Sequence, residues 1–199
     1  STVELANICA ISGARFINLS SSEVYGHVET GAATELREKM PTSYYGNHKL
    51  FAEQEIEYIH KKTGLSFVNL RPSNIFGRRR DGLARGTVDG NFIRNCLQGK
   101  KMNIFGNIDN SRDFVDIHDV TSSIVKFATF SQNEFKYVGN QAYNLASGTD
   151  TRIIDLARFV CSNLGVAENL AISIINRENK LSRFAADISL AKKNFNFSP

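Results

Sequence analysis

The chain has 199 residues, of which 42% are apolar and 22% charged, and its formal net charge is +4. This is an ordinary soluble composition, and no apolar run approaches the ~18 residues of a membrane-spanning helix. The three scattered cysteines and four isolated histidines lack zinc-like spacing, so we expect reduced thiols in a cytoplasmic protein, with no metal site.

Helices and short strands alternate along the chain, and apolar periodicity and end signals set their predicted limits. In chain order we predict a helix over residues 1–12, a strand over 14–20, a polar loop over 20–43, a helix over 44–62, a strand over 66–71, a helix over 91–98 and a strand over 102–105. Beyond these we predict a helix over 116–130, a strand over 141–146, a helix from a Thr151 cap to Gly165, a strand over 170–175 and a helix over 187–195 capped by Asp187. A strand, a long helix and a second strand predict a right-handed parallel crossover, whose sites lie at the carboxyl ends of the strands.

The helix over 44–62 has one stripe that begins with two reactive side chains. Tyr45, Lys49, Ala52, Ile56 and Ile59 are spaced at i, i+4, i+7, i+11 and i+14, which places them on one face. We therefore predict that Tyr45 and Lys49 point inward. A lysine cation favours the phenolate and lowers the pKa of a tyrosine from about 10. Taken alone the pair is a weak signal, because an amphipathic helix can carry both residues by chance.

Hydroxyl groups follow the first predicted strand. Residues 20–22 are all serine and lie at its carboxyl end, where a parallel sheet forms its site. A serine hydroxyl that holds a reacting oxygen, beside a tyrosine and lysine that move its proton, is what carbonyl and alcohol redox chemistry needs. No GxGxxG or GxxGxxG occurs anywhere in the sequence, so the usual dinucleotide fingerprint is missing.

Six segments, in order, resemble those of one family. They are residues 20–26 (SSSEVYG), 45–49 (YGNHK), 71–77 (RPSNIFG), 111–120 (SRDFVDIHDV), 143–148 (YNLASG) and 183–187 (RFAAD), the last followed by two lysines at 192–193. Over nearly its whole length the chain therefore resembles the extended short-chain dehydrogenase/reductases, in the NAD-dependent epimerase/dehydratase family acting on nucleotide sugars. The resemblance implies an α/β fold, the carboxyl-terminal portion of a Rossmann-like doubly wound parallel sheet plus a small α/β substrate-binding lobe. Residues 1–78 and strand 141–146 would form the sheet domain, and residues 79–140 and 147–199 the lobe.

The resemblance also implies roles for individual residues. Tyr45 would be the acid/base, Lys49 would hold the nicotinamide ribose, and Ser21 would be the catalytic hydroxyl. Ser20 and Pro72 would join Tyr45 and Lys49 at the cofactor, which is NAD, with NADP left open. Tyr45 as phenolate would take the O4 proton of the sugar while hydride leaves C4 for NAD, and return of the hydride to the other face would give epimerisation.

Further residues would bind the nucleotide-diphosphate sugar, namely Asn74, Asn91, Arg112, Arg183 and Asp187. The planar fork of Arg112 suits diphosphate oxygens. Asn91 is a weaker candidate than Asn74, and a helix cap explains Asp187 equally well. We expect the basic run at residues 78–80 to be a solvated loop rather than a nucleic-acid site.

Glu23 bears on which reaction follows the oxidation. In this family, members that dehydrate or decarboxylate the sugar use a glutamate at this place, whereas many epimerases have another residue there. The 4,6-dehydratases, however, usually place Asp directly before it, where this chain has Ser22. We therefore favour an epimerase, with a 4,6-dehydratase or decarboxylase as the alternative. A redox-inactive nucleotide binder and a reductase of non-sugar carbonyls are further alternatives.

The resemblance further implies a homodimer and a longer parent protein. Family members usually pair through the helices that here cover residues 1–12 and 44–62, and neither nucleic acid nor membrane is an expected partner. The family's first strands, with their glycine-rich fingerprint, have no counterpart in this sequence, so we expect a fragment of a longer enzyme. We expect this segment alone to bind NAD poorly, to turn over little or nothing, and to expose the edge of the strand over 14–20.

Overall fold

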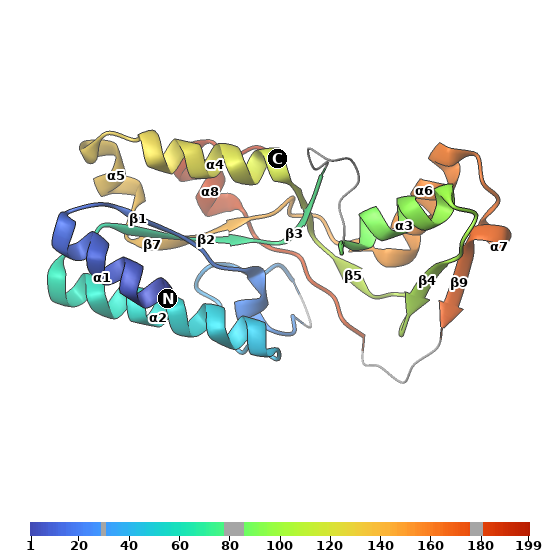
Figure 1. The fold of residues 1–199 in the computed structure, drawn as a ribbon, viewed down its shortest axis with the longest axis horizontal. Coiled ribbons are helices and arrows are strands. Elements are labelled where there is room, and N and C mark those ends of the chain that lie inside the picture. Colours follow the sequence, from blue (N-terminus) through green and yellow to red (C-terminus); the bar gives the residue numbers. More distant parts are fainter. Residues whose placement is uncertain (29–30, 78–85, 176–180) are drawn as a thin grey trace.

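The computed structural model describes residues 1–28, 31–77, 86–175 and 181–199, so the basic run at 78–80 lies outside the described residues. Figure 1 shows two bodies side by side, a larger one built on a parallel sheet and a smaller lobe of helices and short strands. The predicted α/β fold class is confirmed. Within these residues no helix is both long and apolar enough to cross a bilayer.

The larger body is built on a three-stranded parallel sheet in the order β1-β2-β7. Its strands are β1 (Phe16–Leu19), β2 (Phe67–Pro72) and β7 (Gln141–Leu145). In the register, Leu70 at the centre is level with Leu19 on one side and Tyr143 on the other. The predicted parallel pairing is confirmed, β7 pairs with β2, and β1 is an edge of the described sheet, as expected.

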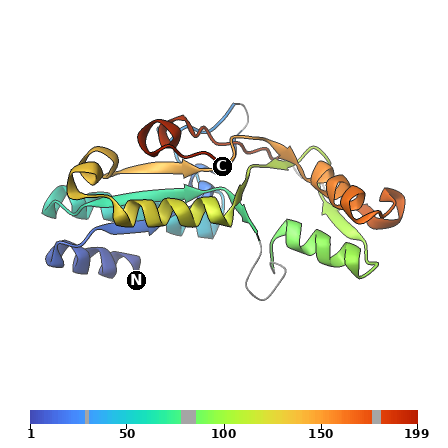
Figure 2. The same ribbon diagram turned by 90° about the horizontal axis from the view of Figure 1, so that it is seen from above.

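Helices cover both faces of this sheet (Figures 1 and 2). One face carries α1 (Thr2–Ser12) and α2 (Tyr44–Thr63), and the other carries α4 (Ile117–Thr129), α5 (Gln132–Val138) and α8 (Ser189–Phe195). The N-cap of α2 is Ser43, whose hydroxyl accepts the N–H of Gly46, and its C-cap is Gly64, in the left-handed conformation. Ala6 of α1 packs in one buried cluster with Ile56 and other side chains of α2, so the two helices form one layer.

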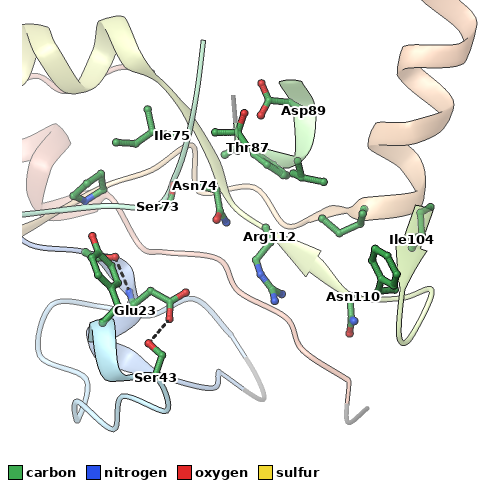
Figure 3. A pocket seen from close by; sticks show the side chains of 18 residues that line it. Glu23, Ser43, Ser73, Asn74, Ile75, Thr87, Asp89, Ile104, Asn110 and Arg112 are labelled. Carbon is green, nitrogen blue, oxygen red and sulfur yellow. Dashed lines mark hydrogen bonds between the residues drawn. The ribbon is translucent and has the colours of Figure 1, made fainter. Parts of the chain in front are cut away.

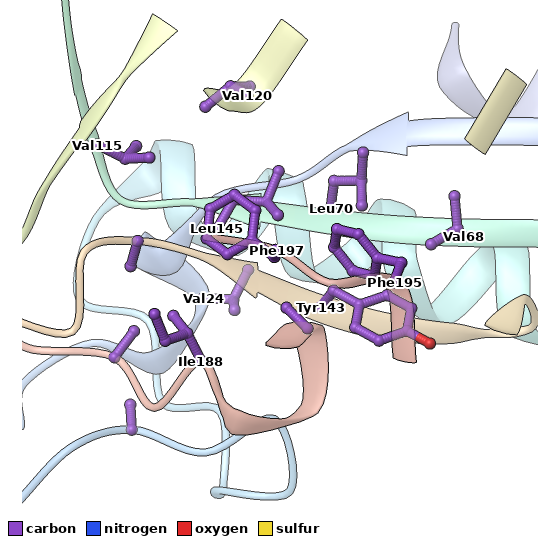
Figure 4. Close-up of a cluster of buried hydrophobic side chains, with 14 of the residues drawn as sticks. Val24, Val68, Leu70, Val115, Val120, Tyr143, Leu145, Ile188, Phe195 and Phe197 are labelled. Carbon is purple, nitrogen blue, oxygen red and sulfur yellow. The ribbon is translucent and has the colours of Figure 1, made fainter. Parts of the chain in front are cut away.

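The main core lies between the sheet and the second helical layer (Figure 4). Phe127 is fully buried, and its ring lies 5.0 to 6.2 Å from those of Phe135, Tyr143 and Phe195. This packing joins α4, α5 and α8 to the sheet, whereas the sequence placed their residues in the substrate lobe. The periodicity of an amphipathic helix reveals that one face is buried, but not against which partner.

The smaller lobe has its own core. Its elements are α3 (Val88–Leu97), β4 (Met102–Phe105), β8 (Thr151–Arg152), α6 (Ile153–Leu164), α7 (Glu168–Ala171) and β9 (Ile172–Ile175). β4 pairs in parallel with β9, and their side chains pack between α3 and α6 around Phe92, Met102 and Val160. Two short pairings lie between this lobe and the sheet: β3 (Asn74–Phe76) with β6 (Phe114–Asp116), and β5 (Ser111–Arg112) with β8.

Some local predictions were wrong. Thr151 does not cap α6, because it lies in β8 and the helix begins after Arg152, whose side chain makes no cap bond. Residues 168–171 form the helix α7, so the predicted strand over 170–175 is shorter. The predicted loop over 20–43 contains a short 3-10 helix, η1 (Ser22–Tyr25). Strands of two or three residues such as β3, β5 and β6 were not predicted, because they carry too little periodicity.

Candidate active site

The serine cluster continues the sheet and then turns into η1. The backbone N–H of Ser20 donates to the carbonyl of Leu70 at 2.8 Å, which extends the β1–β2 pairing by one residue. Ser21 is the N-cap of η1, and its Oγ accepts the N–H of Glu23 at 3.2 Å. Both serines are buried, so the chain holds these hydroxyls firmly at the carboxyl end of β1.

The first turn of α2 is pressed against η1. A Cβ on Gly46 would lie only 2.6 Å from the carbonyl oxygen of Glu23, so glycine is required for this approach. Ser43 Oγ accepts the N–H of Gly46 at 3.0 Å and donates to Glu23 Oε2 at 3.1 Å, as Figure 3 shows for the second bond. The helix that carries Tyr45 and the turn that carries Ser21 are thereby joined directly.

Tyr45 and Lys49 lie together at the start of α2. Lys49 Nζ donates to the carbonyl of Leu19 and lies 5.6 Å from the centre of the Tyr45 ring. The predicted inward stripe is confirmed for Ala52, Ile56 and Ile59, which are buried, but not for Tyr45, which is 54% exposed. Tyr45 lies in the first turn, and there the helix borders an open pocket rather than the core.

This pocket has a volume of about 750 Å³ and lies where the sheet body and the lobe meet (Figure 3). The sheet body lines it with Ser21, Glu23, Ser43, Tyr45, Pro72, Ser73, Asn74 and Ile75. The lobe and its connections line it with Thr87, Val88, Asp89, Ile104, Phe105, Asn110, Arg112, Phe114 and Ile153. Ser21, Glu23 and Tyr45 therefore lie on one wall, and Arg112 lies on the other, together with further polar and apolar side chains.

Arg112 is the cation of the second wall. Its Nη1 donates to the carbonyls of Ser111 at 2.7 Å and Ser182 at 3.0 Å, which anchor the side chain in β5. Burial lowers the pKa of Arg112, and the negative charges of Glu23 and Asp150 oppose that shift. An arginine remains charged under any ordinary condition, so this wall presents a fixed cation suited to an anionic ligand.

The structure brings some of the other predicted substrate residues to this place. Asn74 lines the pocket, and its backbone N–H and Nδ2 both donate to the carbonyl of Asp113, at 3.0 and 3.3 Å. Arg183 is exposed and lines an adjoining pocket of about 190 Å³, which Ser21, Glu23 and Arg112 also line. These residues surround one continuous region with the predicted catalytic set.

Asn91 and Asp187 lie elsewhere. Asn91 lies in α3, where its Oδ1 accepts from Arg94 at 3.1 Å, and it does not line the pocket. Asp187 lines a separate pocket, and its Oδ1 accepts the N–H of Ser189 at 2.7 Å at the start of α8. Hydrogen bonds from Ser189 lower the pKa of Asp187, followed by the charge of Lys192. Asp187 therefore lies just before α8, but it is not the N-cap that we predicted, because that position is Ile188 and α8 begins at Ser189.

Several residues of the site were missed by the sequence reasoning. Ser73 Oγ, Thr87 Oγ1 and Asp89 Oδ1 are buried in residues that line the pocket and have no hydrogen-bond partner among the described residues. Buried polar atoms without partners in a pocket indicate places for a ligand's polar groups. Ser43 also lines the pocket and was missed. Among the missed residues, it alone could have been predicted from the sequence, because a serine directly before a predicted helix is a typical N-cap.

The sheet, the crossover helix and the pocket at its strand ends are those of a Rossmann-like α/β protein. The NAD dependent epimerase/dehydratase family matches residues 1–171, and the chain therefore belongs to this family. The residues of its resembling segments, including those around Ser21, Tyr45 and Arg112, all lie within the matched range except the last one, at 183–187.

Known relatives and solved structures agree with this assignment. A putative UDP-glucose 4-epimerase of Methanocaldococcus jannaschii is 27% identical over 173 residues, which cover 87% of this chain and 54% of that protein. A trifunctional UDP-glucose 4,6-dehydratase/UDP-4-keto-6-deoxy-D-glucose 3,5-epimerase/UDP-4-keto-L-rhamnose-reductase of Arabidopsis thaliana is 27% identical over 195 residues, which cover 95% of this chain and 28% of that protein. The structure of UDP-glucuronic acid 4-epimerase from Bacillus cereus in complex with UDP-glucuronic acid and NAD is similar at a TM-score of 0.86 and 25% identity, over 100% of this chain and 60% of that one. The chain thus spans about half the length, or less, of these curated relatives.

Proposed function

We propose that this chain forms the substrate side of an NAD-dependent nucleotide-sugar epimerase that oxidises C4 of the sugar transiently. The observation that carries the proposal is that Ser21 and Tyr45 line the same pocket as Arg112, on its opposite wall. A sugar hydroxyl would lie at the first wall and the diphosphate at the second. Relatives named as UDP-glucose 4-epimerases support the choice of reaction.

Two residues of the first wall have roles that their contacts support. Tyr45 would take the proton of O4, because its phenol borders the pocket and Lys49 places a cation beside its ring. Ser21 would hold the reacting oxygen, since the cap of η1 fixes its side chain at the end of β1. A proton acceptor and an orienting hydroxyl are what alcohol oxidation asks of the protein.

The pocket also has groups that fit NAD. Ser73 Oγ is buried at the pocket without a partner among the described residues, and Pro72, the last residue of β2, lines it too. Next to the pocket, Ser20 Oγ is also buried without such a partner, and Lys49 donates to the carbonyl of Leu19 at the end of β1. Ser20, Pro72 and Lys49 would hold the nicotinamide ribose end. When bound, NAD would supply the hydride acceptor for C4.

On the second wall, Arg112 would bind the diphosphate, with Asn74 nearby. The guanidinium is held by two carbonyls of this chain, so little side-chain freedom is lost when an anion binds. Arg183, at the adjoining pocket, would contribute a second cation. Neither Asn91 nor Asp187 is needed for this arrangement.

Glu23 favours a second candidate, a 4,6-dehydratase or decarboxylase. Its carboxylate lies at the pocket beside Ser21 and Tyr45 and accepts a hydrogen bond from Ser43. Reactions that continue from a keto sugar by losing water or carbon dioxide use a further acid or base. Relatives include a dTDP-glucose 4,6-dehydratase of Streptomyces antibioticus and a UDP-glucuronic acid decarboxylase 1 of Xenopus tropicalis.

The test uses the complete protein with NAD and, separately, UDP-glucose, UDP-glucuronic acid and dTDP-glucose, with products followed by NMR. We expect a C4 epimer; a 4-keto-6-deoxy sugar or a pentose with carbon dioxide would instead establish the second candidate. Tyr45→Phe removes only the phenol and should abolish turnover while nucleotide-sugar binding persists. Tyr44→Phe is the matched control, because Tyr44 is 89% exposed and should leave turnover unchanged. Binding without turnover in the wild type would establish a redox-inactive binder.

Arg112 separates sugar nucleotides from other carbonyl substrates. Arg112→Ala should raise the KM for a nucleotide sugar about tenfold or more, because it removes a charge-assisted bond to the diphosphate. Arg112→Lys should recover only part of that loss, since an ammonium lacks the planar fork. An unchanged KM would point to a reductase of non-sugar carbonyls.

We also propose that two copies pair through α1 and α2. Leu5, Ile8 and Ile11 on α1 and Phe51 and Tyr58 on α2 are each more than half exposed, and α1 and α2 form a single layer. Such an apolar surface is typical of helix pairing between subunits. Ile8→Glu should convert a dimer into a monomer in sedimentation equilibrium, whereas an unchanged mass would remove this surface from consideration.

A further inference from the structure

A buried chain of polar groups crosses the sheet body below the pocket. Arg71 and Glu53 are each only 1% exposed and form a two-pronged ion pair, from Nε to Oε1 at 2.9 Å and from Nη2 to Oε2 at 2.5 Å. Arg71 Nη1 donates to the hydroxyl of Tyr25 at 2.8 Å, and that hydroxyl donates to Asn144 Oδ1 at 2.7 Å. We call these four residues the Arg71 network.

Each member lies on a different element of the site. Glu53 lies on α2, eight residues after Tyr45 and four after Lys49, and Ile56 on the same face is fully buried. Tyr25 ends η1, the turn that presents Ser21 and Glu23. Arg71 directly precedes Pro72 at the end of β2, and Asn144 lies level with Arg71 on β7. One set of bonds therefore fixes α2, η1, β2 and β7 relative to one another.

The protonation states of Arg71 and Tyr25 favour the hydrogen bonds of this network. Burial lowers the pKa of Arg71, but hydrogen bonds and the charge of Glu53 outweigh burial and raise it overall. Burial raises the pKa of Tyr25 to about 12, against the opposing charge of Arg71. Arg71 thus stays a cation and Tyr25 a neutral phenol across the physiological range, so every bond keeps its direction.

Stability alone does not account for such a network. Burying two charges costs several kcal/mol per ion before pairing, and apolar residues of similar volume often stabilise a fold as well or better. What an apolar pair cannot supply is direction, because van der Waals contacts leave a helix free to rotate or slide slightly. A two-pronged ion pair sets both the rotation of α2 about its axis and its height above β2.

We infer that the Arg71 network is the positioning device of the active site: it sets the rotation and spacing of α2 against η1, and thereby the place of Tyr45 relative to Ser21. The catalytic roles of Tyr45 and Ser21 rest on the proposed function. The geometry that the network sets is independent of it, because the contacts between η1 and the first turn of α2 can be measured without substrate. Two amides report on them: the N–H of Glu23, which donates to Ser21, and the N–H of Gly46, which donates to Ser43.

The matched test compares Tyr25→Phe with Tyr143→Phe. Both tyrosines are at most 1% exposed, and each hydroxyl joins several partners, but Tyr143 binds Val138, Gln141 and Asn194, outside the network. Hydrogen exchange is measured by NMR on the whole chain. In Tyr25→Phe the Glu23 and Gly46 amides should exchange about tenfold faster than in Tyr143→Phe, because local opening is easier. Equal rates in the two variants would overturn the inference.

The second variant removes the ion pair altogether. Glu53→Leu/Arg71→Met replaces both charges with apolar side chains, and its melting temperature should stay close to that of the wild type. The same two amides should again exchange about tenfold faster. Wild-type rates at both amides in a folded double variant would show that apolar packing positions the site equally well. If the double variant does not fold, the tyrosine pair decides alone. In the complete protein, Tyr25→Phe should lower kcat and leave KM unchanged. If the two amides exchange faster but kcat does not fall, the proposed function is wrong and the inference about the network still holds.

Discussion

Asp113 joins three distant segments of the chain, so replacing one oxygen of its carboxylate should destabilise the fold. Its side chain is fully buried. Oδ1 accepts the N–H and the hydroxyl of Ser147, both at 2.7 Å, and Oδ2 accepts the N–H groups of Gly148 at 3.0 Å and Ala186 at 3.1 Å. One carboxylate thus joins the connection after Arg112, the loop after β7 and the segment before α8.

Asp113→Asn keeps the shape but replaces one acceptor oxygen with a donor. If the new amide nitrogen faces Ser147, the Ser147 hydroxyl can rotate to accept from it, and only the Ser147 N–H is left unpaired. If the nitrogen faces the other way, the N–H groups of Gly148 and Ala186 are both left unpaired. Each unpaired buried N–H costs about 1–3 kcal/mol, and the remaining bonds lose their charge assistance. Burial raises the pKa of Asp113 against these hydrogen bonds, so removing the charge returns part of the cost. We expect a net loss of about 2–4 kcal/mol in the free energy of unfolding.

For a chain of this length that loss corresponds to a fall in melting temperature of about 4–16 °C. Thermal unfolding followed by circular dichroism measures it. The control is Asp116→Asn, three residues away, whose Oδ1 caps α4 by accepting the N–H of His118. Asparagine caps a helix as well as aspartate does, so this variant should melt with the wild type. Equal melting of the two variants would refute the reasoning.

Two further predictions concern the site and its surroundings. Gly46→Ala should lower turnover about ten- to hundredfold, because its Cβ would lie 2.6 Å from the Glu23 carbonyl oxygen and ordinary contact begins near 3.4 Å. His48 is exposed, so the control His48→Ala should keep its turnover. Full activity of Gly46→Ala would contradict the close approach. Burial raises the pKa of Glu35, with the Asn144 N–H opposing it. A raised carboxyl pKa means that Glu35 binds its proton more tightly in the folded chain than in the unfolded chain. This tighter proton binding stabilises the fold below the unfolded pKa of about 4.3, and the stabilisation is lost as pH rises through the folded pKa. The stability of the wild type relative to Glu35→Gln, measured by urea unfolding, should therefore fall from pH 4 to pH 7, and a rise would contradict the sign.

The sequence was most informative where local rules decide the structure. The helix predicted over 44–62 is α2 (Tyr44–Thr63), because a serine cap, one apolar stripe and a closing glycine all agree. The strand predicted over 102–105 coincides with β4. The order of strand, long helix and strand correctly predicted that β1 and β2 pair in parallel. Ser21 lines the pocket because it follows β1, and sites of a parallel sheet lie at the carboxyl ends of its strands.

It was least informative where distant segments meet. α3 begins at Val88, three residues before the predicted start, and so Thr87 and Asp89 rather than Asn91 line the pocket. Asp187 was predicted as a ligand residue or a helix cap, but it lines a pocket apart from the candidate site and lies one residue before the N-cap, Ile188. The role of Asp113 was invisible, because its partners lie 34 or more residues away along the chain. Short strands and clamps of this kind depend on tertiary packing, which periodicity does not encode.

The two buried polar centres of the molecule meet in one segment, and this leads to the last prediction. Asp113 accepts the N–H of Ala186, and Asn144 of the Arg71 network donates to the carbonyl of Asp187 at 2.9 Å. Loosening either bond frees the same backbone, so Asp113→Asn and Tyr25→Phe should not be independent. Groups that share backbone couple by about 0.5–3 kcal/mol, and we expect the lower end because Tyr25 acts through Asn144. A double-mutant cycle of unfolding free energies measures the coupling. Additivity within about 0.3 kcal/mol would mean that the Asp113 carboxylate and the Arg71 network stabilise the fold independently. A clear coupling would mean that the lobe carrying Arg112 and the helix carrying Tyr45 are held in place by one connected structure.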